Sequence, residues 1–382
     1  MKTMFPSLTV FTPETFFNSY LGEKMYMGKY QTNRILNEDV KDILSIVIGI
    51  DACDIQGLSF VGTKIRYLDK DLNVKSFVPY FAFSDKSKDG QFYSDALSNV
   101  FDASPILKQV PFRFVISDAE AATRKGIRLS KNSGIITQSF YCVNHNLSLV
   151  FKAVLDICHE VKQIEVAINS TCGILTSSSL KSSFTEKCHS YGLPNTFLES
   201  VPTRWLYLVD VFKRCYVLRK VIIEMSFQAK FLGIRKGGYV SLRHIQVVGD
   251  LLPILQMLKE FSDVVEGEKY STIDIVIPYL MCIKSACKQH LKRLTITREA
   301  YKFISTLSRL LEAYPDAGRS YIFLLIGSFL NPAYRGKIFN NDMNILKIIS
   351  DVPPTQSPRL LSIRFQVTWE IYREEYLKIP RQ

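Results

Sequence analysis

Two aspartates that each follow an apolar run are the residues with the clearest chemical potential in this chain. Asp51 closes the run LSIVIGID, and Asp118 closes FRFVISD. Neighbouring carboxylates repel each other, so both stay ionised only beside a cation or hydrogen-bond donors. Mg²⁺ ions held between carboxylates activate water and stabilise the leaving oxygen when a phosphodiester bond is cut. The pair therefore predicts a metal site of the kind that cuts nucleic acid, provided that the two runs are neighbouring strands.

A Cys-x-x-His pattern at Cys142 and His145 follows a further apolar run. A structural zinc site needs four ligands, usually from a second Cys/His pair at a defined spacing. The adjacent Cys188 and His189 do not provide that spacing. We therefore expect Cys142 and His145 to order the end of a strand beside the aspartates, where His145 can contact a phosphate.

Arg204 and Trp205 stand in a Pro-Thr-Arg-Trp turn. An exposed indole can stack on an unpaired base while the neighbouring guanidinium holds a phosphate. The alternative is a core tryptophan in helix packing.

A third carboxylate is not singled out by any local pattern. Asp54 is expected to be a loop or capping residue rather than a ligand. Glu160 and Glu165 fall on the helix expected after the last strand. The remaining candidates lie far downstream: Glu312, Glu370, Glu374 and Glu375.

The elements that must position these residues read as three strands in a meander, followed by two strands that alternate with helices. Right-handed crossovers then favour a five-stranded sheet in the order 3-2-1-4-5, in which the first and fourth strands are parallel neighbours. Asp51 and Asp118 would lie at the carboxyl ends of these strands, where the strand order reverses and ligand sites form. The expected strands are 44–51, 57–69, 74–83, 112–118 and 135–142, with helices at 91–101, 119–129 and 146–168 and a turn at 69–73.

After residue 150 the apolar spacing is helical almost throughout. We therefore expect an N-terminal helical arm at 1–40, an α/β core at 41–150 and an all-helical unit at 151–382. Pro253 and Pro278 could kink or bound helices.

Composition favours a folded protein with a polyanionic partner. The 382 residues are 47% hydrophobic and 22% charged, with a net charge of +12. Such an excess of positive charge favours DNA or RNA as the partner. A basic protein without a nucleic-acid partner explains the charge equally well. Basic clusters that could contact phosphates lie at 124–128, 233–244 and 287–293. Eight scattered cysteines predict reduced thiols in an intracellular protein. The longest apolar run, 321–330, is too short for a bilayer, so no membrane is expected.

Taken together and in this order, these segments resemble the hAT superfamily of transposases over roughly residues 10–345. The resemblance implies an RNase H-like fold with a large helical insertion domain. It also implies that Asp51 and Asp118 descend from metal-binding catalytic acids, and that Cys142, His145, Arg204 and Trp205 lie near the bound DNA end. The matching segments are IVIGIDACDIQGLSFVGTKIRYLD, ISDAEAATRKG, CVNHNLSLVF, TRWLYLVDVFKR, LLPILQMLKEFSDVVEGEKYSTIDIVIPYL and SFLNPAYRGKIF.

The chain also departs from the family pattern. Ala52, Cys53 and Asp54 replace the Trp-Thr after the first acid, and Ala119 and Ala122 replace asparagines of the second motif. We find neither the zinc finger that precedes the family's core nor the C-terminal segment with its third acid and dimerisation region.

The expectation is thus a transposase-derived protein, truncated at both ends and without strand cleavage, that binds DNA or protein partners and no small-molecule substrate. The alternative is an active metal-dependent transposase or nuclease that uses Asp51, Asp118, an unidentified glutamate and Mg²⁺ or Mn²⁺. A third possibility is a degenerate product without a selected role. A nuclear location follows only from the proposed DNA partner.

Overall fold

The computed structural model describes residues 38–55, 58–71, 73–84, 88–177, 180–197, 207–231, 239–267 and 272–313, together with Leu324 and Ser328. The chain divides into two compact units, one of residues 1–272 and 282–320 and the other of residues 273–281 and 321–382. In the second unit, the Ser328 hydroxyl donates to the main-chain carbonyl of Asp274 at 2.8 Å. Most of the expected N-terminal arm lies outside the described residues.

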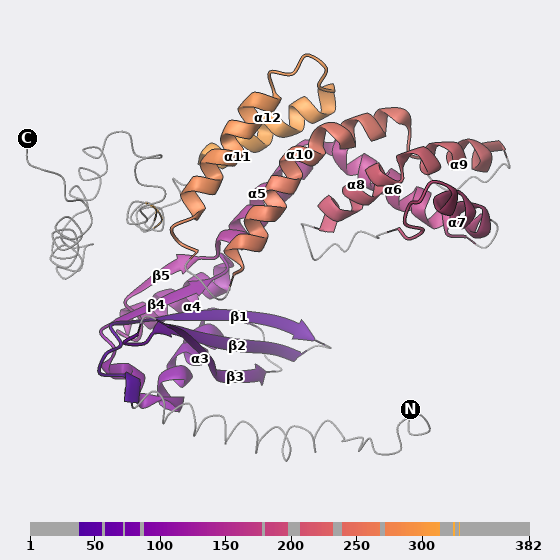
Figure 1. Ribbon diagram of the computed structural model, residues 1–382. Helices are drawn as coiled ribbons and strands as arrows, with labels where there is room; N and C mark the ends of the chain where they lie inside the picture. The colour runs from indigo at the N-terminus through magenta and orange to yellow at the C-terminus, as the bar shows by residue number, and fades with distance from the viewer. Residues whose placement is uncertain are drawn as a thin grey trace, which may run out of the picture. The chain divides into compact units, whose positions relative to one another are not determined.

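The predicted sheet order is confirmed. Strands β1 (Ser45–Ile55), β2 (Leu58–Leu68) and β3 (Val74–Ser84) form an antiparallel meander. Strands β4 (Phe112–Ser117) and β5 (Gln138–Tyr141) continue the sheet in parallel beside β1. The order β3-β2-β1-β4-β5 is that expected for an RNase H-like sheet with β1 at its centre (Figure 1).

One face of this sheet forms the core. Alternate residues of β1, which are Ile46, Ile48 and Ile50, are at most 3% exposed. Helices α3 (Gly90–Ala103) and α4 (Ala121–Asn132) contribute apolar side chains to the same cluster. Because side chains alternate along a strand, the next residues of β1, Val47, Gly49 and Asp51, point to the opposite face.

The expected long helix at 146–168 is wrong in one respect, because the structure breaks it at Cys158. Helix α5 (Val143–Ile157) ends there and α6 (His159–Leu175) begins there. Cys158 has ψ 64°, which is not helical, and its buried side chain is 1% exposed. A one-residue break without proline or glycine leaves the apolar spacing nearly intact, so the sequence carries no signal for it.

The remaining helices of the described residues follow in sequence. Pro253 lies inside α10, and Pro278 is the third residue of α11. No helix of the described ranges combines the length and apolarity that a membrane span requires. The helices are α7 (Lys181–Ser190), α8 (Tyr207–Val217), α9 (Arg219–Phe231), α10 (Leu242–Val265), α11 (Val276–His290) and α12 (Arg298–Ala313).

Helix α5 joins the sheet to the helices, since it follows β5 directly and packs against α10 and α12. At its start, the Asn144 amide donates to the main-chain carbonyl of Ser262 at 3.3 Å and to the Glu266 carboxylate at 2.7 Å. Further along, Phe151 packs edge to face on Phe303, with ring centroids 5.9 Å apart. The predicted boundary near residue 150 therefore falls inside a helix that contacts both parts.

Helices α3 and α4 approach closely through Gly126. A Cβ at this position would lie 2.5 Å from the Tyr93 Cβ and 2.7 Å from the Gly90 carbonyl oxygen. We expect Gly126→Ala to lower the free energy of unfolding by about 1–3 kcal/mol, because the backbone must shift to admit the methyl group. Urea denaturation followed by circular dichroism measures the change.

Gly173 in α6 is the matched control, since a Cβ there would meet no heavy atom within 4 Å. Alanine forms helix better than glycine by about 1 kcal/mol, so Gly173→Ala should stabilise the protein. Equal effects of the two substitutions would contradict the close helix contact.

Candidate functional site

A cavity of about 560 Å³ opens at the point where β1 and β4 part. It brings together four of the six predicted site residues, which are Asp51, Asp118, Cys142 and His145. The other two, Arg204 and Trp205, lie outside the described residues. The rest of the lining consists of Gly49, Ile50, Gly62, Thr63, Lys64, Val78, Phe81, Ile116 and Ser117.

Asp51 lies within β1 and not at its end, which corrects the expectation from the apolar run. Strand β1 continues to Ile55 because it stays paired with β2, in which Gly62 is the partner of Asp51. Parallel pairing with β4 stops earlier, at Gly49 and Ile116. The end of the apolar run thus marks the point where β1 loses β4 as a neighbour, while β1 itself continues beside β2.

Both aspartates lie just beyond the last paired residues of β1 and β4. Asp51 is two residues beyond Gly49, and Asp118 is two residues beyond Ile116, the parallel partner of Gly49. Asp118 directly follows the end of β4, so the lining of the cavity, and not strand pairing, brings the two carboxylates together. The alternation along β1 places Asp51 on the face of the sheet opposite the α3–α4 core.

Cys142 and His145 reach the cavity through the β4–β5 pair. The Cys142 N–H donates to the Ser117 carbonyl at 2.7 Å, which extends the parallel ladder by one residue beyond β5. Helix α5 starts at the next residue, so His145 lies in its first turn. These positions agree with the prediction that Cys142 and His145 order the strand end beside the aspartates. Contact of His145 with a phosphate stays a prediction.

Both carboxylates retain room for a ligand. Asp51 is exposed, and its Oδ1 accepts a hydrogen bond from the Ala52 N–H at 2.8 Å. Asp118 is half-buried. Neither aspartate forms an ion pair within the described ranges. Mg²⁺ is often held by one or two carboxylates while its other positions are filled by water and substrate phosphates. The two aspartates fit that kind of ion.

The candidates for a third carboxylate are placed elsewhere. Asp54 is in β1, not in a loop, and it pairs with Lys88 at 2.8 Å, whose hydrogen bond lowers the Asp54 pKa. Glu160 pairs with Lys302 at 3.1 Å. Glu312 pairs with Lys288 at 3.5 Å. Glu165 is on α6, and the three downstream glutamates lie outside the described residues. Within the described ranges, no group of three or more His, Cys, Asp or Glu side chains is placed to hold a metal ion.

Comparison with known proteins identifies no family. No protein-family model matches the chain, and no curated protein gives a significant match. The hAT resemblance therefore rests on the sequence motifs alone and stays a hypothesis.

The sequence did not single out three lining residues of β2 and β3. Lys64 adds a positive charge to the cavity, and Val78 and Phe81 are 64% and 43% exposed. Phe81 stacks on Phe60, with ring centroids 6.0 Å apart. The available signal was the run VKSFVPYFAF, whose large apolar residues occupy both faces of the strand although only one face is core.

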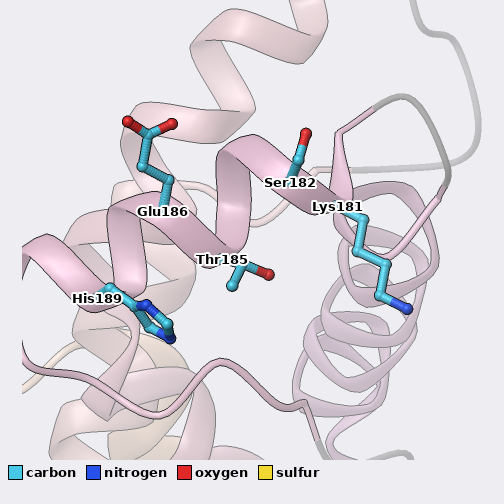
Figure 2. Close-up of a pocket in the computed structure, with 5 residues that line it drawn as sticks. All are labelled: Lys181, Ser182, Thr185, Glu186 and His189. Carbon is cyan, nitrogen blue, oxygen red and sulfur yellow. The ribbon is translucent and has the colours of Figure 1, made fainter.

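A second cavity, of about 660 Å³, is less suited to binding. It is lined by Lys181, Ser182, Thr185, Glu186 and His189, all from helix α7. The Glu186 carboxylate points away from the His189 imidazole (Figure 2). The side chains do not converge on a common point, so we assign no chemistry to this surface.

Proposed function

We propose that the chain is a transposase-derived protein that binds DNA at the edge of the sheet formed by β1, β4 and β5, and that it does not cut the strand. The observation that carries the proposal is that Asp51 and Asp118 line one cavity together with His145. A hard cation held by such a pair can accept phosphate oxygens as its remaining ligands. The net charge of +12 favours the same kind of partner.

The apolar part of the cavity favours a nucleotide over a free anion as the ligand. Phe81 presents a partly exposed ring, and stacking of a base on an aromatic side chain contributes about 1–3 kcal/mol. Lys64 lies on the neighbouring strand and can pair with a phosphate. The base and the phosphate would then each meet a side chain of matching chemistry.

The proposal of binding without cleavage rests on the number of carboxylates. The family mechanism implied by the resemblance needs three acids, and the cavity within the described ranges provides two. Two acids hold one metal ion, whereas stabilising both the attacking and the leaving oxygen takes two ions about 3.5–4 Å apart. With two acids the chain can therefore still bind DNA through one metal ion, but it lacks the second ion that cleavage requires.

The test incubates the full chain with labelled duplex and hairpin DNA in Mg²⁺, Mn²⁺ or EDTA. We expect association that weakens as salt rises, and no shortened product. Metal-dependent nicks that disappear in both Asp51→Asn and Asp118→Asn would contradict the proposal and support the active nuclease, the second candidate that two carboxylates in one cavity allow. A well-folded chain that neither binds nor cuts DNA would favour the protein-interaction role.

A further inference from the structure

A third cavity, of about 460 Å³, lies between helix α4 and strand β5 and is strongly basic. We call it the α4–β5 groove. Its lining contains four cationic side chains and no aspartate or glutamate. The lining residues are Ala121, Arg124, Lys125, Ile127, Arg128, Lys131, Ser139 and Tyr141.

The cations occupy one face of α4 because of their spacing. Arg124, Arg128 and Lys131 are four and three residues apart, which places them one above the other on a helix. The opposite face of α4 carries Thr123 and Ser130, which are fully buried. The Lys131 ammonium donates to the Gln138 side chain at 2.6 Å and so ties the end of the helix to β5.

The helix that presents these charges is held firmly in place. Gly90 and Gly126 allow α3 and α4 to approach until a Cβ at either position would clash. The buried Ser94 and Ser130 hydroxyls are hydrogen-bonded at 3.2 Å. The aliphatic stem of Lys125 lies against Gly90, so this long side chain is positioned by packing and keeps its charge at the surface. Because the helix is already fixed, binding an anion would order side chains only, and no backbone.

The row is electrostatically unfavourable without a ligand. Arg124 is in the first turn of α4, where the helix dipole disfavours cations, and Glu120, the N-cap residue, is the one acidic residue at this end of the helix. Arg124, Lys125 and Arg128 form no ion pair with any other residue in the described part of the chain. Like charges four residues apart also repel. An anion in the groove would offset both the repulsion between the cations and the unfavourable position of Arg124 in the helix dipole.

The groove and the aspartate cavity are formed by segments that adjoin in sequence. Asp118 is three residues before Ala121, the first residue of α4, and Tyr141 directly precedes Cys142. Ser139 and Tyr141 are partners of the buried Val115 and Ser117, so the groove lies on the α4 face of the sheet, and the aspartate cavity opens on the other face. The guanidinium of an arginine can donate two parallel hydrogen bonds to phosphate oxygens. The Ser139 and Tyr141 hydroxyls are further hydrogen-bond donors.

We propose that the α4–β5 groove binds consecutive phosphates of the nucleic-acid backbone. The inference rests on the proposed function and adds a second site, one that positions the strand without reading its sequence. Backbone contacts of this kind fix orientation and register on the nucleic acid.

The test compares Arg124→Gln/Arg128→Gln with Arg298→Gln/Arg309→Gln, a control that removes two exposed arginines of α12 and the same net charge. Each phosphate neutralised by a cation contributes about 0.9 to the slope of log affinity against log salt on duplex DNA. Fluorescence anisotropy with duplex DNA should therefore show the slope of the first variant reduced by about 1.8, while the control keeps the wild-type slope. The same loss should appear with unrelated sequences.

Two further readouts separate binding from folding. The melting temperature of Arg124→Gln/Arg128→Gln should equal or exceed that of the wild type, because repulsion is removed. Bound DNA should protect Arg124 and Arg128, but not Arg309, from phenylglyoxal, as mass spectrometry of peptides can show.

The inference is overturned, and the proposed function stands, if the wild type binds DNA and the salt slope of Arg124→Gln/Arg128→Gln equals that of the wild type. Displacement of the DNA by polyglutamate at equal charge would overturn it in favour of an acidic protein partner. A wild-type chain that does not bind DNA would overturn the proposed function and this inference together.

Discussion

Replacing Phe151 with alanine should lower the free energy of unfolding by about 3–5 kcal/mol, the usual loss for a buried phenylalanine. Its side chain is 2% exposed and packs edge to face on Phe303, which is fully buried in α12. The substitution removes the transfer free energy of the ring and leaves a cavity in which Phe303 loses its partner. Because α5 joins the sheet to the helices, we expect both parts to be destabilised.

Urea denaturation followed by circular dichroism measures this loss. Phe227→Ala is the control, since Phe227 is 66% exposed on α9 and its truncation should change stability by at most about 0.5 kcal/mol. A double-mutant cycle with Phe303→Ala should give a coupling of about 0.5–1.5 kcal/mol for the ring pair. A midpoint for Phe151→Ala equal to that of Phe227→Ala would contradict the packing of α5 on α12.

The sheet was predictable because its order follows from few choices. Three strands with short turns form a meander, and the handedness of crossovers leaves one favourable place for the next two strands. The turn at 69–73 is held by Asp69, whose carboxylate accepts from the Asp71 and Asn73 N–H groups at 3.0 and 2.8 Å. Such local interactions are encoded by residues close in sequence.

Other features depend on residues far apart in the chain. Asn144 meets Glu266 and Phe151 meets Phe303 across more than one hundred residues, and no spacing rule specifies either contact. The position of Asp51 within its strand was missed because pairing with β2 outlasts pairing with β4. Lys64 and Phe81 were missed because their place in the cavity depends on the register of β2 and β3.

Replacing Asp51 and Asp118 together with asparagine should reverse the effect of Mg²⁺ on DNA binding. In EDTA, two carboxylates without a bound cation, about 6 Å from phosphates, cost about 1 kcal/mol each, for an effective dielectric constant between those of a protein surface and water. The variant should therefore bind about 30-fold more tightly than the wild type in EDTA, since 1.4 kcal/mol is about tenfold.

Added Mg²⁺ should then act in opposite directions on the two proteins at constant ionic strength. In the wild type it should strengthen binding, because Asp51 and Asp118 would hold a cation whose charge offsets their repulsion of the phosphates. In Asp51→Asn/Asp118→Asn it should only compete for phosphates and weaken binding.

The control for this pair is Asp42→Asn/Asp71→Asn, which changes the net charge equally at exposed positions outside the cavity. Fluorescence anisotropy in EDTA and in Mg²⁺ should show wild-type behaviour for it. If the cavity variant and the control respond alike to Mg²⁺, the two aspartates do not share a cation with the bound phosphates. The shared cavity of Asp51 and Asp118 would then be a feature of the fold alone, and DNA binding would have to be sought in the α4–β5 groove.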